Sequence, residues 1–437
     1  MRYFIACLFL VTCFAITGAA VSARAATYQV GPSRTLKKLQ DVAPLLAPGD
    51  LVEVDGNATY PGDVIFTVPG TPTNKITIRG LRVNGLRPTL SGGTNTVEFR
   101  LSNHYVFEGF DVTGGTFRGI YHHAHDITVR DTVVRDCPAH GILGADTDSG
   151  SLTLEYVEVY NCGNGTGQHP VYMATDEFKY PGAVFRMQYC YLHDQRGGNN
   201  IKSRAERNEI YYNWISGGFY GEIELIGPDP QGNKKVSTDT KREDSDVVGN
   251  VFAHKATQGT RMVRVGSDGT GQTKGRYRFV NNTFILRQGQ VSPAFEIFEG
   301  IDSLEVHNNV FYRPGNEPID KVVLETRVRW VAGRVSVGTN NWLPVGSAMI
   351  PTGWTGTVFG TNPNFVNLST LDLRPAVGSA LIGAGVNAPP SPAGHPFPNP
   401  LWPPAFHPPL HTLLAPGTAA ARPSDGLIDI GAYEYAP

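Results

Sequence analysis

Charged residues are scarce in this chain, and the patterns typical of long helices are rare. Only 17% of its 437 residues are Asp, Glu, Lys or Arg, and the formal net charge is −2. The chain therefore lacks the strong field that would favour nucleic acid or an anionic membrane as a partner. It is also poor in the runs of Lys, Glu and Ala that helical proteins use, which argues against a mainly helical fold.

Long apolar runs are missing except at the N-terminus. There, Phe4–Ile16 follows Arg2 and precedes the small-x-small sequence Ala23-Arg24-Ala25. This order predicts a cleavable secretory signal over residues 1–25. The run is shorter than the ~20 apolar residues that a membrane-spanning helix needs. We expect a mature protein that is secreted or periplasmic, monomeric and without a membrane span.

Cysteine is rare as well. Of the five cysteines, Cys7 and Cys13 lie in the signal, and Cys137, Cys162 and Cys190 remain. Their spacing matches no zinc motif. Cys137 and Cys162 occupy equivalent places in successive repeats, VVRDC and EVYNC. Strands one repeat apart are separated by about 4.8 Å, which is within disulfide reach. Either a disulfide or a column of small buried side chains fits this spacing.

Turn formers are abundant, with 50 Gly and 32 Pro, and they separate a repeated strand. From about residue 76 a short alternating strand, often with Asn or Gly at its centre, recurs at a spacing of roughly 23 to 37 residues. The copies include TVRDTVV, TLEYVEV, FVNNTFI and VHNNVFY. Most are followed by a polar turn and a second strand, as in HGILGA, HPVYMA, NNIKSR, GEIELI and RMVRV. This rhythm predicts an all-β, right-handed parallel β-helix, in which stacked Asn side chains can hydrogen-bond along a corner.

Both ends of the solenoid have distinct patterns. Thr35–Leu46 has helical periodicity and predicts a short capping helix, with one face formed by Leu36, Leu39, Val42 and Leu45. We place the β-helix and its cap at residues 26–315, and the last rungs with a Pro-rich strap at residues 316–437. The strap itself is Ala388–Pro416.

The second strands can be aligned by their inward apolar positions, and this alignment produces one outward column. The column reads Tyr172, Lys202, Glu224, Arg264 and Glu296. Neighbouring members are about one strand spacing, 4.8 Å, apart, so they are within mutual reach. The column is either a ladder of structural ion pairs or the floor of a groove that binds an extended polymer.

A groove of this composition suits β-elimination on an acidic, uronate-containing polysaccharide. That reaction removes the C5 proton and protonates the leaving O4. Lys202 lies between Arg204 and Arg264, and a lysine whose pKa is lowered by neighbouring cations can act as the base. Glu224 opposes that shift. Arg264, Tyr172 and His169 are candidates to protonate the leaving group or bind the carboxylate.

Other polar residues are candidates for binding. We expect Arg204, Glu224, Asn200, His140 and His123 to contact substrate, because each lies on or beside the second-strand series. The HHAHD sequence that contains His123 is either a polar groove wall or, through His123 and His125, part of a metal site. Calcium takes six to eight oxygen ligands, and the candidate ligands are Glu222, Glu224 and Asn199.

Nearly the whole mature chain resembles bacterial pectate-lyase-like β-helix proteins. The stretch YQVGPSRTLKKLQDVAPLLAPGDLVEV resembles their cap, the NNTF and NNVF cores resemble their rungs, and DIGAYEY resembles the ending of many exported members. The resemblance implies the fold, but not one chemistry, since this fold hosts lyases, hydrolases, epimerases and non-enzymes.

A narrower resemblance covers NNIKSRAERNEIYYNWISGG, which is similar to a segment of chondroitinase-B and alginate-lyase-like enzymes. In that segment an IKS-like strand carries the catalytic lysine, which implies this role for Lys202. The family's arginine lies on the next rung, where this chain has GEIELIGP with Ile226 near the expected place. The family's calcium carboxylates are replaced here by Gln195, Gly197, Asn199 and Asn200.

Three alternatives remain open from the sequence. A glycoside hydrolase would use two carboxylates, and the candidates are Glu222, Glu224, Asp146 and Asp148. A C5 epimerase would use the same groove, and a surface protein would bind glycan without catalysis. The polar insertion at residues 227–246 either walls the groove, with Lys234, Lys235, Lys241 and Arg242 facing a polyanion, or is a solvated excursion.

Overall fold

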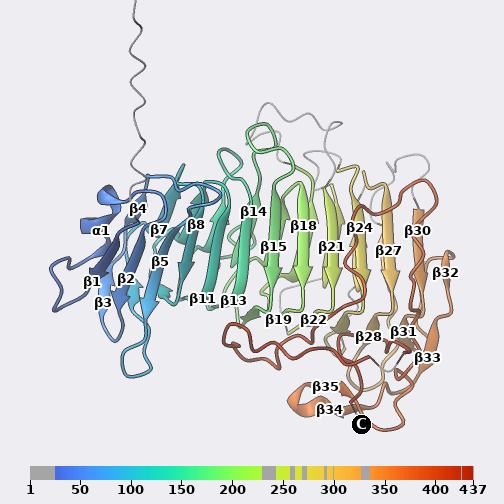
Figure 1. Ribbon diagram of the computed structural model, residues 1–437. Helices are drawn as coiled ribbons and strands as arrows, with labels where there is room; N and C mark the ends of the chain where they lie inside the picture. The colour runs from blue at the N-terminus through green and yellow to red at the C-terminus, as the bar shows by residue number, and fades with distance from the viewer. Residues whose placement is uncertain are drawn as a thin grey trace, which may run out of the picture.

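The computed structural model describes residues 25–228, 243–255, 261–267, 273–289, 293–298, 300–325, 335–424 and 426–436. These residues form an elongated solenoid in which short strands stack side by side along the whole length (Figure 1). All pairings between the rungs are parallel, so the predicted parallel β-helix is confirmed. Within the described ranges, no helix is long and apolar enough to cross a membrane.

Three stacks of strands form the three faces of the solenoid. The first stack comprises β1 (Thr27–Val30), β2 (Leu51–Asp55), β5 (Ile76–Leu81), β8 (Tyr105–Glu108), β11 (Ile127–Arg135), β13 (Leu152–Tyr160), β15 (Val184–Gln188), β18 (Arg207–Tyr211), β21 (Asp244–Val248), β24 (Arg276–Val280), β27 (Ser303–His307), β30 (Val335–Thr339) and β32 (Trp354–Thr355). The second stack comprises β3 (Thr59–Pro61), β6 (Thr89–Ser91), β9 (Asp111–Thr113), the later halves of β11 and β13, β16 (Tyr191–His193), β19 (Trp214–Ser216), β22 (Val251–Ala253), β25 (Thr283–Ile285), β28 (Val310–Tyr312), β31 (Trp342–Pro344) and β33 (Val358–Gly360).

The third stack is a separate sheet and carries the predicted second strands. It comprises β4 (Val64–Phe66), β7 (Asn95–Arg100), β10 (Arg118–His123), β12 (His140–Gly144), β14 (Val171–Ala174), β17 (Asn199–Arg204), β20 (Gly221–Ile226), β23 (Val263–Gly266), β26 (Phe295–Ile297) and β29 (Val323–Glu325). Outside the three stacks, β34 (Phe365–Asn367) and β35 (Asp372–Pro375) pair antiparallel, with the short 3₁₀ helix η2 (Leu368–Thr370) between them.

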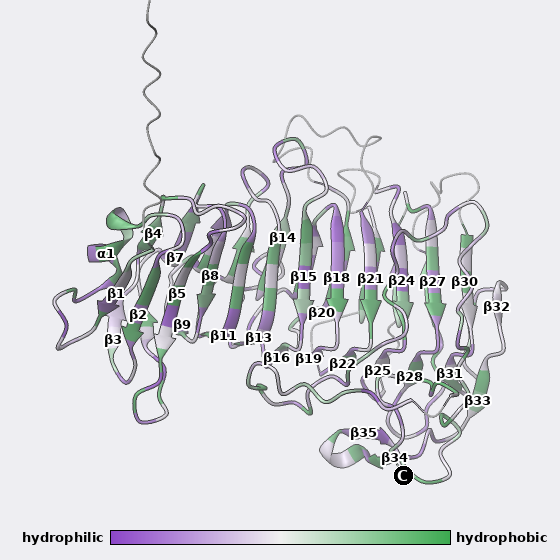
Figure 2. Ribbon diagram, in the orientation of Figure 1, coloured by the Kyte–Doolittle hydropathy of each residue, from purple (hydrophilic) through white to green (hydrophobic). Residues whose placement is uncertain are grey.

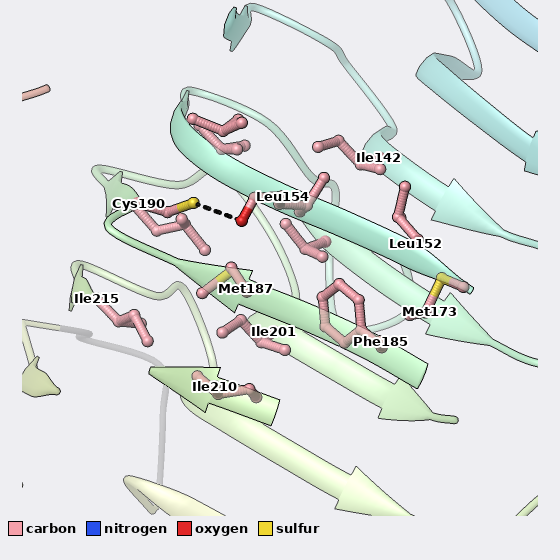
Figure 3. Packing of buried hydrophobic residues seen from close by; sticks show 14 of the residues in the cluster. Ile142, Leu152, Leu154, Met173, Phe185, Met187, Cys190, Ile201, Ile210 and Ile215 are labelled. Carbon is pink, nitrogen blue, oxygen red and sulfur yellow. Dashed lines mark hydrogen bonds between the residues drawn. The ribbon is translucent and has the colours of Figure 1, made fainter. Parts of the chain in front are cut away.

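The core is the continuous column of side chains between the three stacks. Inward positions alternate with outward ones along each strand, so apolar and polar colours alternate in Figure 2. Rings stack from rung to rung in the core: the centroids of Phe252 and Phe284 lie 5.0 Å apart, and those of Phe284 and Phe311 lie 4.9 Å apart. Figure 3 shows the same layering earlier in the chain, where Ile142, Met173 and Ile201 come from successive rungs of the third stack.

Most of the predicted first strands prove to be two strands joined at a corner, whereas β11 and β13 run through the corner as single strands. In the NN pairs the first Asn has a left-handed backbone, with φ of 53° at Asn281 and 55° at Asn308. The second Asn is buried and joins a ladder. Its Oδ1 accepts from the backbone N–H and the Nδ2 of the ladder residue one rung before. The ladder consists of Asn213, Asn250, Asn282, Asn309 and Asn341.

The three described cysteines are buried free thiols. Cys190 stands at the head of the Asn ladder, because its backbone N–H donates to Oδ1 of Asn213 at 2.8 Å. Cys137 and Cys162 occupy equivalent places after β11 and β13, as expected. Of the two arrangements that fit the sequence, the structure has the column of small buried side chains.

The capping helix is shorter than predicted. It consists of α1 (Leu39–Val42) followed by the 3₁₀ helix η1 (Ala43–Leu45). Pro44 lies within η1, and a proline removes an N–H from the helical ladder, which explains the early change to a tighter helix. The change also rotates the last turn, so Leu45 is 53% exposed and does not join the apolar face predicted for it.

The Pro-rich strap lies along the first stack. Arg207 on β18 donates to the carbonyl of Pro398, and Arg276 on β24 donates to that of Pro396, both at 2.8 Å. The backbone N–H of Leu401 donates to Asp246 on β21 at 2.7 Å. The strap contacts β18, β21 and β24, whereas the charged column predicted from the sequence belongs to the third stack.

Candidate active-site groove

The outward column of the third stack has the register predicted from the sequence. Pairs of Cα partners run in an unbroken series, Tyr172 to Lys202, Lys202 to Glu224, Glu224 to Arg264, and Arg264 to Glu296. Continuing toward the N-terminus, the same column holds Leu143, Tyr121 and Glu98. The apolar inward positions fix this register, since a shift of one residue would turn every charged side chain into the core.

Tyr172, Lys202 and Arg204 form the centre of the site. The Nζ atom of Lys202 lies 5.2 Å from the centroid of the Tyr172 ring, and Nε of Arg204 donates to the Tyr172 phenol oxygen at 3.0 Å. Arg204 is 4% exposed and also donates to the carbonyl of Gly227. Tyr172 and Lys202 are half-buried. Arg204 therefore binds the Tyr172 phenol, and Lys202 lies over the ring of the same tyrosine.

His140 and His169 lie beside this centre and are held as neutral donors. The backbone N–H of His169 donates to Nδ1 of His140 at 3.1 Å, and that of Asn199 donates to Nδ1 of His169 at 3.0 Å. Since Nδ1 accepts in both rings, the neutral imidazole carries its proton on Nε2. Burial lowers the pKa of His140 to about 4. Burial, and then the nearby Lys202 charge, hold the pKa of His169 well below its usual value.

Glu224 is bound on two sides. Its carboxylate accepts from Nη1 of Arg264 at 2.7 Å and from the side-chain amide of Asn199. Arg264 in turn stacks on Phe298, with 3.8 Å between the guanidinium carbon and the ring centroid. The guanidinium of Arg264 thus offsets the Glu224 charge next to Lys202.

Glu222 and Asn200 do not face the groove. Glu222 is 0% exposed and lies in a corner, where its carboxylate accepts from the Asn200 side chain, from the Gly218 backbone N–H and at 3.0 Å from His254 Nδ1. Asn200 is also 0% exposed. The chain bends between these residues and the Lys202 column, so Asn200 cannot contact substrate as predicted. Its role is to bind Glu222 in the interior.

The proposed calcium ligands do not converge. Glu222 lies in the interior with its own donors, whereas Glu224 and Asn199 bind each other beside the Arg264 guanidinium. A divalent cation there would lie close to an arginine. In the described part of the chain, no group of three His, Cys, Asp or Glu side chains has the arrangement needed to hold a metal ion. The residues present therefore do not fit a calcium site.

His123 lies at the far end of the same face. Its Nε2 is 2.9 Å from Oε1 of Glu98, and its ring stacks on Tyr121 at 4.4 Å. His123 and His125 do not converge as the metal alternative requires, because His123 binds Glu98 whereas His125 stacks on Tyr180 at 4.7 Å. The other interpretation of this segment, a polar groove wall, stays a prediction.

Asp148, one of the hydrolase candidates, lies in a turn. Asp148 has a left-handed backbone, φ 67°, and accepts from Lys179 at 2.6 Å, so it is a turn residue in an ion pair. The polar insertion ends where β21 begins at Asp244, earlier than predicted. Its four basic residues, Lys234, Lys235, Lys241 and Arg242, lie outside the described residues.

Sequence reasoning missed three residues of this face. Glu98, Tyr121 and Arg118 lie on β7 and β10, and the guanidinium carbon of Arg118 is 3.8 Å from the Tyr121 ring centroid. The same alignment, extended three strands toward the N-terminus, would have found them. RGIYHH is a less regular copy of the second strand, with Arg118 at one end and two histidines at the other.

Comparison with known proteins supports the fold. No family model matches the chain, and no curated protein matches its sequence. Pectate lyase Pel9A is similar in structure, with a TM-score of 0.54 and 13% identity over 94% of this chain and 96% of that one. An alginate lyase from Paenibacillus sp. str. FPU-7 has a TM-score of 0.42 and 16% identity over 69% and 98%. A GH136 lacto-N-biosidase from Eubacterium ramulus has a TM-score of 0.36 and 13% identity over 72% of this chain and 67% of that one. The chain thus has the pectate-lyase-like parallel β-helix scaffold.

Proposed function

We propose that this protein is an exported polysaccharide lyase that cleaves a uronate-containing polymer by β-elimination along the third stack. The juxtaposition of Lys202, Tyr172 and Arg204 carries the proposal. Elimination needs a base for C5–H, an acid for the leaving oxygen and positive charge near the carboxylate. The outward column supplies all three: Tyr172 and Lys202 lie on neighbouring strands, about 4.8 Å apart, and Arg264 lies two strands beyond Lys202.

In the proposed reaction each group has one role. Neutral Lys202 takes the C5 proton, the C4=C5 double bond forms, and the C4–O4 bond breaks. Tyr172 gives its phenol proton to the departing O4. The Arg204 guanidinium stabilises the phenolate that remains, since an opposite charge favours the ionised form. Arg264, with five N–H donors in a planar fork, binds the uronate carboxylate.

His140 and His169 support the same face as donors. Each neutral ring presents Nε2–H, which suits sugar hydroxyls or a carboxylate. Their low pKa values exclude a charged imidazolium in this role at neutral pH. His169 therefore binds substrate in this proposal, and Tyr172 rather than His169 protonates the leaving group.

Two of the four carboxylates considered for a hydrolase, Glu222 and Asp148, are engaged away from the outward column. A glycoside hydrolase needs two carboxyl groups on either side of the scissile bond. Glu222 is fully buried, and Asp148 is paired with Lys179 in a turn, so neither can accompany Glu224 in the groove. A strap lying over the charged column would have favoured a non-catalytic binder. In the contacts that the described residues make, the strap lies on the first stack and not on that column.

The experiment uses residues 26–437 and a panel of uronate polysaccharides, with and without calcium. The absorbance of the unsaturated product is followed in the ultraviolet. We expect a rise with at least one polymer, no requirement for calcium, and a loss of at least ~100-fold in kcat for Lys202→Ala. Lys37→Ala, on the exposed cap, is the matched control.

Three outcomes would contradict the proposal. One is no rise with any polymer, and another is new reducing ends without ultraviolet absorbance, which indicates hydrolysis. The third is exchange of the C5 hydrogen with solvent without chain cleavage, which indicates an epimerase. A rise that Lys202→Ala leaves unchanged would keep the lyase but remove Lys202 as its base.

A further inference from the structure

A cavity lies on the second stack, away from the Lys202 column. Its volume is about 490 Å³, within the range of ligand pockets. The floor is the outward face of five successive rungs, paired in register: Thr59, Thr89, Asp111, Val133 and Glu158. The side chains of Thr59, Thr89 and Val133 are short and leave space above these strands. The strands of the solenoid therefore form the bottom of the cavity.

One wall of the cavity is a tight hairpin between β5 and β6. Val83 and Leu86 form an antiparallel bridge, and the turn residues Asn84 and Gly85 have φ of 51° and 78°. Two successive left-handed residues form the tight turn that suits a two-residue hairpin. Leu86, 57% exposed, lines the cavity. Arg87 fixes the base of the hairpin through ion pairing with Asp131 at 2.5 Å. The wall is therefore preformed.

The opposite end of the cavity is aromatic. Tyr160 lines it and stacks on His193 with centroids 5.0 Å apart, and His193 stacks on Tyr191 at 4.1 Å. His193 is the register partner of Tyr160 on the following rung, so it covers one face of the ring. On the preceding rung the register partner of Tyr160 is Arg135.

The positive and negative charges that line the cavity are equal in number. Arg135 donates to Asp111 at 2.9 and 2.8 Å, and Glu158 lies 3.2 Å from His193 Nε2 through one carboxylate oxygen. The lining contains two arginines, Arg87 and Arg135, and two carboxylates, Asp111 and Glu158. An acidic ligand gains no net attraction here, whereas a polyol finds charged acceptors and donors side by side.

We propose that this cavity binds a neutral sugar residue of a polysaccharide. The apolar face of the sugar packs on Tyr160, and its hydroxyls bond to Glu158, Asp111 and the Arg135 guanidinium. The site lies on another stack than the Lys202 groove and differs from it in charge. Binding of a neutral sugar here does not depend on the lyase proposal. A role in holding the protein on a polymer while the groove acts on an acidic one does rest on it.

The test is calorimetric titration of residues 26–437 with neutral tetrasaccharides of β-1,4-linked glucose, mannose and galactose, and with a tetragalacturonate. We expect one neutral tetrasaccharide to bind and tetragalacturonate not to compete with it. Tyr160→Ala should weaken this binding by roughly tenfold. Thr89→Tyr, an outward change that fills the floor, should abolish it. Phe359→Ala, an exposed aromatic at the far end of the second stack, is the matched control and should keep the wild-type affinity.

The proposal would be overturned by three results. These are no binding of any neutral tetrasaccharide at about 10 mM, binding that survives both Tyr160→Ala and Thr89→Tyr, or tighter binding of tetragalacturonate that the same two variants remove. The thermal midpoint of each variant is measured first. Since both altered side chains point outward, we expect both variants to fold.

Discussion

Nε of Arg204 donates a 3.0 Å hydrogen bond to the phenol oxygen of Tyr172, one rung earlier on the third stack. Ala174, not Tyr172, is the register partner of Arg204, so the arginine reaches diagonally across the rung. The buried guanidinium holds the phenol next to Lys202. This contact is the reason that Tyr172, and not a histidine, has the acid role in the proposed lyase.

Replacing the phenol tests that role. Tyr172→Phe keeps the ring against Lys202 but removes the proton donor and the acceptor for Arg204. We expect kcat to fall by roughly 100-fold, since positioned acids contribute about 10²–10⁴-fold, and KM to change little. Tyr121→Phe, in the same column two rungs away, should change kcat by less than ~3-fold. Equal effects of the two variants on kcat would remove Tyr172 from catalysis.

His169 should affect binding rather than the pH profile. Its pKa is held well below the usual value by burial and by Lys202, so it stays neutral across the pH range of catalysis. We expect His169→Gln, which retains an N–H donor, to raise KM while the acidic limb of kcat against pH stays in place. A shift of that limb in the variant would show that His169 titrates during the reaction.

The register of this site was predictable because the side chains that set it are apolar and inward. The strands are aligned by four inward apolar residues, Val171, Ile201, Ile223 and Val263. The outward residue of the column is the next residue along each strand. The corners were not predictable in the same way. Asn200 and Glu222 precede the column by two residues, and only the bend of the backbone turns them inward.

The cavity on the second stack had no sequence signal either. Its floor residues come from five successive rungs and are spread over the chain between Thr59 and Glu158. Its depth depends on which outward side chains are short and on how the Val83–Leu86 hairpin folds over them. The sequence also did not predict which side chains in the column bind one another. Glu224 binds Arg264 and Asn199, not Lys202, and a strand alignment gives positions but not the direction of side chains.

Acid should destabilise the fold through buried histidines. His122 is 0% exposed, its Nε2 bonds to the Gly150 carbonyl at 3.2 Å, and burial lowers its pKa to about 4. A histidine of unfolded chain titrates near 6.5. Above pH 6.5 His122 is neutral in both the folded and the unfolded chain, so its titration costs no stability. As the pH falls from about 6.5 to 4, the unfolded chain binds the proton first, and the free energy of unfolding decreases. The loss is roughly 3 kcal/mol for this one residue.

Urea unfolding at a series of pH values measures that loss. His122→Gln keeps a donor for the Gly150 carbonyl but does not titrate, so we expect a flatter dependence of unfolding free energy on pH between 6.5 and 4. His411→Gln, on the exposed strap, should keep the wild-type slope. An unchanged slope in His122→Gln would show that other groups cause the acid sensitivity.

The Asn ladder should be the most sensitive polar element of the core. Asn250 accepts from the backbone and side chain of Asn213 and donates to Ile210 and Asn282. Asn250→Ala would leave several buried groups unpaired, each costing about 1–3 kcal/mol. We expect a total loss of roughly 3 kcal/mol or more, measured by urea unfolding. Exposed Asn74→Ala should change stability by less than ~0.5 kcal/mol, and an equally small effect at Asn250 would exclude the ladder as a stabilising element.

Thiol titration tests both the cysteine column and the signal. Cys137, Cys162 and Cys190 are each 0% exposed, so we expect no reaction with a thiol reagent in the native exported protein and complete reaction in denaturant. The sequence has five cysteines, and Cys7 and Cys13 lie in the predicted signal, so 5 − 2 = 3 thiols should appear. One thiol would indicate that a Cys137–Cys162 disulfide forms after export. Five would show that the N-terminal segment is retained, because only the intact chain contains Cys7 and Cys13.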